Sequence, residues 1–295
     1  MPEPIDPSLS RIHLGDEILR ANLHQFSAGK DPENPEANED LFASSDTSFV
    51  LADGSTAKEG TKDVAAIYGK SGGQVAAEIA VRATQESELN GVNLVRHVTK
   101  QLNEEYRRNY PAALEDSRRR FAVTLLAARI VGNELVITQV GDSGFRINGR
   151  DVFVPSMLID MLDAQARATA IHQALNLGLD EPAAAKFGRE YIEPSLNQQY
   201  SYRNNPHHLL GFGCIDGGEV PEKFIKTGSF QLRDVSTLEM FSDGYPVHPP
   251  AATVEAWEAA YEQAQAEDPL RYKKHLATKP ADDRTVAILE FSPST

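Results

Sequence analysis

Apolar residues recur with a helical spacing in the segment that follows residue 70. One set of positions separated by three or four residues consists of Val92, Val95, Thr99, Leu102 and Tyr106. Such spacing places side chains on one face of a helix. Residues 71–84 show similar spacing, and the turn dipeptide Asn90-Gly91 separates the two segments. We therefore expect two consecutive amphipathic helices that form an antiparallel pair.

Between residues 121 and 154 the pattern changes to short apolar runs separated by turn residues. A continuous apolar run covers residues 121–131, and an alternating run covers residues 134–140. Gly132-Asn133 and Asn148-Gly149 are turn dipeptides at the ends of such runs. These signals predict hairpins in series and therefore antiparallel sheet.

The remaining apolar patterns complete the set of expected elements. Residues 157–187 and 253–266 have helical character, whereas residues 188–226 are rich in loop-forming residues. Further strands are expected at residues 48–52, 230–234, 237–241 and 285–291. Because the strands cluster as hairpins and do not alternate with helices, we expect an α+β fold in which helices cover antiparallel sheets.

The polar N-terminal segment sets the expected domain boundary. Residues 1–36 are rich in Pro, Asp and Glu, so we expect an irregular N-terminal lead-in. Residues 37–295 show no internal repeat and no clear linker. We expect the strands at 48–52 and 285–291 to share one sheet, and residues 37–295 to form a single domain.

The composition is that of an ordinary globular protein with an excess of acidic residues. The chain has 295 residues, of which 41% are hydrophobic and 24% charged, and its formal net charge is −14. Such a charge repels nucleic acid; it suits cation binding, although solubility alone also explains it. The single cysteine, Cys214, has no partner for an internal disulfide. Without a secretory-signal pattern or an apolar run of about 20 residues, the sequence predicts a cytoplasmic protein without a membrane partner, and it leaves the oligomeric state open.

Acidic residues stand next to glycine or at the ends of several expected strands. The five places are Asn38-Glu39-Asp40, Asp53-Gly54, Gly141-Asp142-Ser143, Asp243-Gly244 and Asp282-Asp283. Each place alone is typical of a structural turn, and spacing does not show that the five converge. Carboxylates that do gather repel one another unless a hard divalent cation such as Mg²⁺ or Mn²⁺ neutralises them. A following glycine would let the backbone approach such a cation closely.

The order of these motifs resembles that of the metal-dependent protein phosphatase family, the type 2C serine/threonine phosphatases, and its bacterial members in particular. The motifs are NED at residues 38–40, LADG at 51–54, VGDSGF at 140–145, MFSDG at 240–244 and DDRTVAIL at 282–289. Each motif is weak alone, but the five follow the family's order over residues 37–291 and have strand contexts that fit.

The resemblance implies a four-layer αββα sandwich with two Mn²⁺ or Mg²⁺ ions at one end. The implied ligands are Asp53, bridging both ions, the carbonyl of Gly54, then Asp243 and Asp282, and, mostly through bound water, Asp40 and Glu39. Asp142 matches a position used for an additional, weaker metal or for orienting metal-bound water. A water bridging the two ions, held through Asp53 and Asp243, would attack the phosphorus of a phosphoserine or phosphothreonine in a protein substrate.

The sequence departs from the family where the substrate phosphate is usually bound. Pro35 stands where many members have an arginine, and Lys30 is the nearest upstream cation. Arg203 is a further cation that could bind phosphate. No histidine follows Asp53-Gly54 to act as general acid. His248 is a candidate for that role, although an ordinary position in a surface loop is the simpler explanation.

These departures leave alternatives to an active phosphoprotein phosphatase open. A catalytically weak or inactive member would keep the metal ligands, lack the phosphate clamp and act as a regulatory binding module. A third alternative is a phosphatase of small molecules with the same fold. Turnover of phosphopeptides with and without Mn²⁺ distinguishes these functions.

Overall fold

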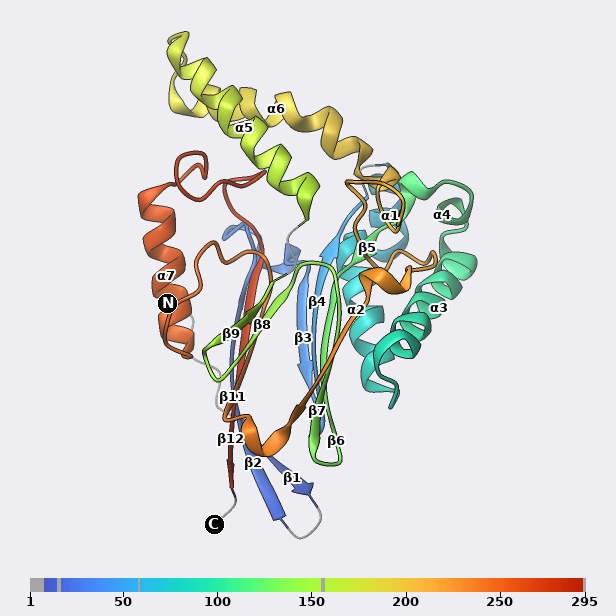
Figure 1. Ribbon diagram of the computed structural model, residues 1–295. Coiled ribbons are helices and arrows are strands. Elements are labelled where there is room, and N and C mark those ends of the chain that lie inside the picture. Colours follow the sequence, from blue (N-terminus) through green and yellow to red (C-terminus); the bar gives the residue numbers. More distant parts are fainter. Residues whose placement is uncertain (1–7, 15–16, 58, 155–156, 294–295) are drawn as a thin grey trace.

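The computed structural model describes residues 8–14, 17–57, 59–154 and 157–293, and its strands form two antiparallel sheets that face each other (Figure 1). The order of the first sheet is β1 (Ser8–Leu14), β2 (Glu17–Ala28), β12 (Arg284–Pro293), β11 (Thr237–Phe241), β8 (Gly144–Ile147) and β9 (Asp151–Phe153). The order of the second is β10 (Lys226–Gln231), β7 (Glu134–Val140), β6 (Leu125–Val131), β4 (Ser48–Ser55) and β3 (Asp40–Ser44), with β5 (Ala122–Val123) paired to β4.

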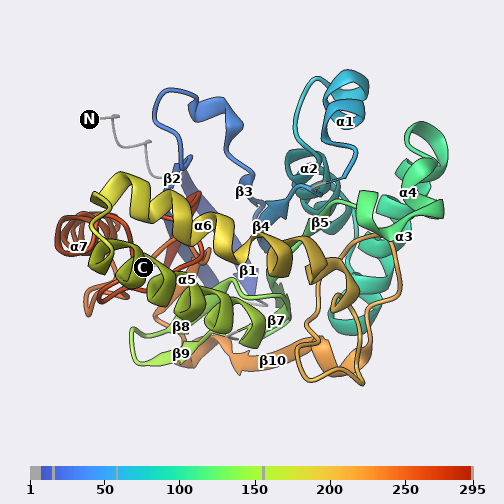
Figure 2. The same cartoon turned by 90° about the horizontal axis from the view of Figure 1, so that it is seen from above.

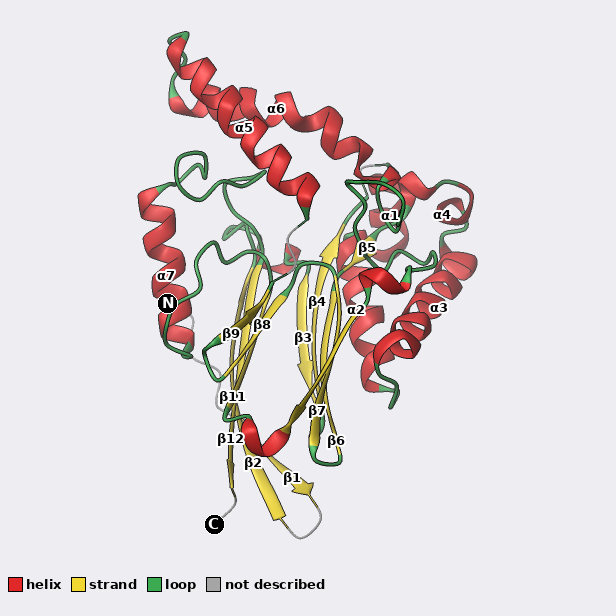
Figure 3. Ribbon diagram, in the orientation of Figure 1, coloured by secondary structure: helices red, strands yellow, loops and turns green. Residues whose placement is uncertain are grey.

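Helices cover the outer face of each sheet (Figure 3). The second sheet is covered by α1 (Thr61–Tyr68), α2 (Gly72–Gln85), α3 (Gly91–Asn109) and α4 (Ala112–Glu115). The first sheet is covered by α7 (Val254–Glu267). Short 3-10 turns lie at Pro35–Ala37, Ser117–Arg119, Gln199–Ser201, Glu222–Phe224 and Leu232–Asp234. The order helix, sheet, sheet, helix is the αββα sandwich, so the predicted α+β class is confirmed.

Alternating side chains of the strands fill the spaces between these layers. In β4, Phe49 and Leu51 belong to the core between the two sheets, whereas Val50 and Ala52 pack under α2 and α3. The strand is therefore buried on both faces, which explains why its sequence is continuously apolar and does not alternate.

The two helices expected before residue 107 are present and their boundaries have local causes. Ser71 begins α2 with a capping box, in which its hydroxyl accepts a hydrogen bond from the Gln74 backbone N–H and the Gln74 side chain accepts one from the Ser71 backbone. In α3, Val95 and Leu102 are buried on the face that packs toward the second sheet, as their spacing predicted.

The prediction that residues 1–36 form an irregular lead-in is wrong. β1 and β2 lie in this segment, and β2 pairs with β12 from Ala28 opposite Arg284 to Leu19 opposite Pro293. Ala21 and Leu23 are buried in the core between the sheets, while Asn22 and His24 are not. This period-two alternation marks a strand, but the surrounding polar composition concealed it.

The expected pairing of residues 48–52 with residues 285–291 in one sheet is also wrong. The former belong to β4 in the second sheet and the latter to β12 in the first. β12 is hydrogen-bonded instead to β2 and β11 on its two sides. The expectation that residues 37–295 form a single domain rested on this shared sheet. Without it, the single domain stays a prediction.

A helical hairpin inserted between β9 and β10 lies across one end of the sandwich. It consists of α5 (Leu158–Asn176) and α6 (Glu181–Gln198), so the segment expected to be loop-rich from residue 188 remains helical to residue 198. Viewed from above, the hairpin crosses the ends of both sheets, from the side of α7 toward that of α3 and α4 (Figure 2). Among the described residues, no helix has the length and apolar character needed to cross a membrane.

Candidate metal centre

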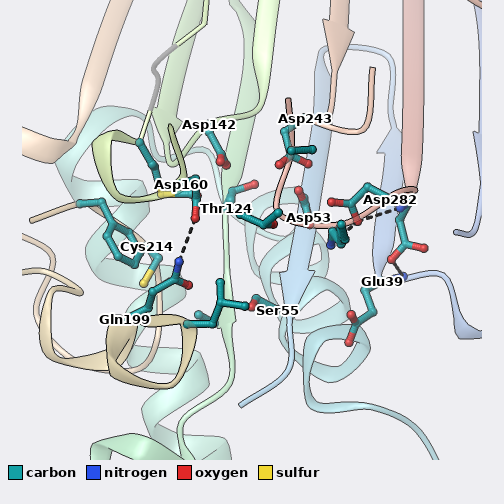
Figure 4. A pocket seen from close by; sticks show the side chains of 18 of the residues that line it. Glu39, Asp53, Ser55, Thr124, Asp142, Asp160, Gln199, Cys214, Asp243 and Asp282 are labelled. Carbon is teal, nitrogen blue, oxygen red and sulfur yellow. Dashed lines mark hydrogen bonds and ion pairs between the residues drawn. The ribbon is translucent and has the colours of Figure 1, made fainter. Parts of the chain in front are cut away.

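Three aspartates from different parts of the chain meet beneath the α5–α6 hairpin (Figure 4). Asp53 lies near the end of β4, Asp142 lies in the turn between β7 and β8, and Asp243 follows β11. One carboxylate oxygen from each lies within 4.8 Å of the others. Because β4 and β11 belong to opposite sheets, the site straddles the end of the sandwich.

The backbone around Thr124 holds Asp53 beside the Asp142 turn. The N–H of Thr124 donates to the Asp53 carbonyl at 2.9 Å, and its Oγ1 lies 2.9 Å from Oγ of Ser143. Gly141 has φ of +93°, and a Cβ there would lie 2.6 Å from the Thr124 side chain. Glycine is therefore required at this turn, both for its conformation and for the close approach.

Asp40 is opposite Asp53 in the pairing of β3 with β4, and one of its oxygens has no partner. Its Oδ2 accepts a hydrogen bond from Oγ of Ser242 at 2.7 Å, whereas the buried Oδ1 accepts none. Burial, with the charges of Asp243 and Asp282, raises the pKa of Asp40 to about 7. A buried acceptor without a donor is costly unless something binds it, and a cation or its bound water fits this position.

The pKa values of the three aspartates are all raised, although the charge of Lys279 lowers that of Asp243 in part. Burial and then Asp40 raise the pKa of Asp53 well above its ordinary value. Burial and then Asp243 do the same to the pKa of Asp142. Loss of bulk water in the pocket, followed by the charge of Asp282, raises the pKa of Asp243 to about 6. Hard oxygen ligands in this arrangement fit a divalent cation such as Mg²⁺ or Mn²⁺.

Asp282 lies beside this cluster but is already paired on one oxygen. Its Oδ1 lies 2.5 Å from Nζ of Lys279 and accepts the N–H of Asp283 at 2.9 Å. Its Oδ2 has no hydrogen-bond partner within the described part of the chain. Asp282, an expected metal ligand, therefore lies near the centre, and the protein fixes its Oδ1.

Glu39 and Gly54 are tied to the start of α2. The Glu39 Oε1 accepts hydrogen bonds from Thr56 Oγ1 at 2.5 Å and Ser71 Oγ at 2.6 Å, and its Oε2 pairs with Lys30 at 3.2 Å. A Cβ on Gly54 would lie 2.2 Å from the carbonyl oxygen of Gly73. Three protein donors thus hold Glu39, and its water-mediated metal role stays a prediction.

The other cations and the histidine singled out from the sequence lie around the same pocket. Lys30 pairs with Asp283 at 2.8 Å in addition to Glu39, and Arg203 donates to the carbonyl of Arg120. His248 packs its ring 4.5 Å from that of Phe241, and burial, then Arg146, lowers its pKa. His248 therefore lines the pocket with its ring packed on Phe241.

The pocket above the carboxylates has a volume of about 1060 Å³ and includes residues that carry no sequence motif. Asp160 of α5 enters it and accepts a hydrogen bond from Gln199 at 2.8 Å; burial raises its pKa to about 6. Arg271 and Lys279 enter from the loop between α7 and β12. A lysine three residues before Asp282 was visible in the sequence, but nothing marked Asp160 or Arg271.

These motifs and their geometry are similar to those of a known family. The family model described as Protein phosphatase 2C matches residues 34–173, just under half of the chain. That segment includes four of the expected ligands, Glu39, Asp40, Asp53 and Gly54, together with Asp142. Over this segment the chain is similar to protein phosphatase 2C. None of the curated proteins compared with it matches in sequence.

One solved phosphatase structure shares the fold at low sequence identity. The catalytic domain of PstP in complex with two manganese ions is 15% identical, with a TM-score of 0.52; the alignment covers 92% of this chain and 99% of that one. Two further solved structures are similar with lower TM-scores. The Mycobacterium tuberculosis phosphatase PstP/Ppp is 18% identical, covers 92% and 98%, and has a TM-score of 0.47. Stp1 from Staphylococcus aureus is 15% identical, covers 98% and 99%, and has a TM-score of 0.48. The resemblance expected from the ordered motifs is confirmed.

Proposed function

We propose that this chain, which resembles protein phosphatase 2C over residues 34–173, hydrolyses phosphoserine and phosphothreonine monoesters in proteins and depends on divalent cations. The observation that carries the proposal is the meeting of Asp53 of β4, Asp142 of the β7–β8 turn and Asp243 after β11, from both sheets, at one end of a phosphatase-like fold. A hydrolytic centre of this kind needs such a convergence, whereas turn-forming aspartates with structural roles do not.

The proposed cations are Mn²⁺ or Mg²⁺, two per centre. Their ligands would be Asp53, the Gly54 carbonyl, Asp243 and Asp282, with Asp40 and Glu39 acting mostly through water and Asp142 at an additional site. When bound, divalent cations supply Lewis-acid polarisation of the phosphate and activation of a water nucleophile.

The protein's own contribution would be to hold oxygen ligands in fixed positions. Ser242 donates to Asp40 through Oγ and receives the N–H of Thr285 on the same oxygen at 2.9 Å, so it links β3 to β12. Thr124 fixes the backbone of Asp53. The α5–α6 hairpin contributes Asp160 and Arg189 to the lining of the pocket.

One observation favours the second function, a regulatory binding module with little or no turnover. Pro35, where the family commonly has a phosphate-binding arginine, begins a 3-10 turn. The nearby cation Lys30 is held in ion pairs with Asp283 and Glu39, so its amine is committed to carboxylates. Such a module would bind Mn²⁺ and a phosphoprotein without releasing phosphate.

The test is phosphate release from peptides that carry phosphoserine or phosphothreonine, assayed with Mn²⁺ and after its removal with EDTA. We expect Mn²⁺-dependent turnover, abolished by EDTA and lowered at least about 100-fold by Asp53→Asn, because loss of a ligand exceeds the effect typical of residues that merely orient one. Asp46→Asn is the matched control, since Asp46 is exposed in the β3–β4 turn and should leave activity unchanged.

Turnover that survives EDTA, or that is unaffected by Asp53→Asn, would overturn the proposed mechanism. Mn²⁺ binding without turnover of any peptide or small phosphoester would support the binding module instead. Faster hydrolysis of small phosphoesters than of phosphopeptides would indicate that the substrates are phosphorylated metabolites.

A further inference from the structure

The loop between α7 and β12 presents a buried arginine to the pocket. Arg271 is 7% exposed and lines the pocket above the carboxylates. Its Nε donates to the carbonyl of His275 at 3.3 Å. Its two terminal nitrogens have no hydrogen-bond or ion-pair partner among the described residues. Buried guanidinium groups are normally paired, so this one has donor capacity left for a bound anion.

The backbone of Arg271 is strained and the surrounding loop maintains the strain. Its φ is +50°, a left-handed conformation that a residue with a Cβ seldom adopts. Strain of this kind persists where the neighbouring structure enforces it and is concentrated at functional sites.

The loop is held from both ends by charged side chains. The carboxylate of Asp268 accepts the backbone N–H groups of four residues: Tyr272, Lys273, Lys274 and His275. Arg167 of α5 donates to the carbonyls of Leu270, Arg271 and Ala277, and Arg189 of α6 donates to that of Thr278. The hairpin thus fixes the loop, and the Arg271 guanidinium is positioned before any ligand arrives.

Arg271 differs from the other cations of the pocket in that, among the described residues, both of its terminal nitrogens are free. Lys30 and Lys279 are ion-paired with carboxylates, and Arg118 is paired with Asp116. Arg189 and Arg203 each donate one terminal nitrogen to a backbone carbonyl. Burial lowers the pKa of Arg271, and the charges of Asp243 and Asp282, two of the expected metal ligands, partly offset that effect. Its charge therefore lies next to the proposed metal centre.

We propose that Arg271 binds the phosphoryl group of the substrate, with its terminal amino groups donating to two phosphate oxygens at the metal centre. The proposal rests on the proposed function and assigns its missing phosphate clamp to the α7–β12 loop. A planar guanidinium with two free donors matches the geometry of a phosphate, and its burial strengthens the interaction. Lys279, in contact with Asp282, would orient that carboxylate.

The experiment measures the affinity of the Mn²⁺-loaded chain for inorganic phosphate by calorimetry, in Arg271→Gly and Arg271→Lys. Glycine adopts a φ of +50° without strain, so Arg271→Gly removes the guanidinium and leaves the loop in place. We expect about 10- to 100-fold weaker phosphate binding in Arg271→Gly, as for loss of a hydrogen bond between charged groups, and partial recovery in Arg271→Lys. Affinity for Mn²⁺ and the melting temperature should stay close to wild type.

The matched control is Arg118→Ala, which removes another arginine from the pocket lining, one already paired with Asp116. Phosphate affinity there should remain within about twofold of wild type, as for an exposed ion pair. The proposal is overturned if Arg271→Gly keeps wild-type phosphate affinity, if it loses Mn²⁺ affinity in parallel, or if the wild-type chain does not bind phosphate. A wild-type chain that binds phosphate through Arg271 without turnover would contradict the proposed function and leave this inference standing.

Discussion

Gly54 controls the position of Asp53 through the absence of a side chain. Its Cα faces the start of α2, where a Cβ would lie 2.2 Å from the carbonyl oxygen of Gly73. A Cβ on Gly73 would in turn lie 2.4 Å from Oε1 of Glu39. Two glycines therefore let the end of β4, the first turn of α2 and the Glu39 carboxylate approach one another.

Gly54→Ala should accordingly destabilise the fold and displace Asp53. We expect a loss of about 1–3 kcal/mol in the free energy of unfolding, typical of overpacking, together with weaker Mn²⁺ binding. Urea denaturation and Mn²⁺ titration measure the two effects. Gly29→Ala is the control, because its nearest neighbour would lie at an ordinary 3.4 Å. Equal stability of the two variants would contradict this prediction, because it would show that the start of α2 shifts to accept the added Cβ without cost.

Residues at the strand ends were predictable, whereas those in the loops were not. Asp53 near the end of β4, and Asp142 and Asp243 just after strands, have recognisable local sequence, and the structure brings them together. Arg271 has no such signal, because its position depends on distant hydrogen bonds from Arg167. Local patterns report local structure, and a loop fixed by tertiary contacts leaves little trace in its own sequence.

At the scale of elements, the loop after α7 depends on a single buried carboxylate. Asp268 is fully buried and, although burial raises its pKa, the backbone N–H groups it accepts lower the pKa to about 2. A carboxylate with a pKa below its ordinary value of 3.8 stabilises the folded state above that pH. This contribution is lost as the pH falls from about 4 to about 2.

Asp268→Asn should remove much of this stabilisation, because an amide cannot accept as many N–H groups as a carboxylate. We expect a loss of about 1.5–3 kcal/mol at neutral pH, the scale of a hydrogen bond to a charged group. Stability measured by urea denaturation should also depend less on pH between about 4 and 2 than in wild type. Asp46→Asn, at an exposed turn, should behave as wild type; equal behaviour of both variants would contradict the role given to Asp268.

The elements themselves were predicted unevenly for a physical reason. Helix α3 is buried along one apolar face and strand β4 on both faces, so the first shows a helical period and the second a continuous apolar run. β2 is paired along its length with β12 but has a polar surrounding sequence, and composition alone assigned it to an irregular segment. Pairing between distant strands stabilises a segment without changing its local pattern.

At the scale of the whole molecule, the site exists only because the two sheets of the sandwich bring their strand ends together. β4 and β7 approach it from the second sheet and β11 from the first, and the α5–α6 hairpin closes it from above (Figure 1). The sequence predicted two antiparallel sheets covered by helices, but not which strands share a sheet. That choice follows from packing across the core between the sheets, which joins residues more than 200 positions apart.

The most direct test of the proposed metal centre is anomalous diffraction from crystals soaked in Mn²⁺, recorded on both sides of the manganese absorption edge. The account predicts two anomalous peaks beside Asp53, with Asp243 and Asp282 at one of them, and none in crystals of Asp53→Asn. Wild-type crystals without a peak among Asp53, Asp142 and Asp243 at saturating Mn²⁺, or with manganese only at other acidic places, would contradict it.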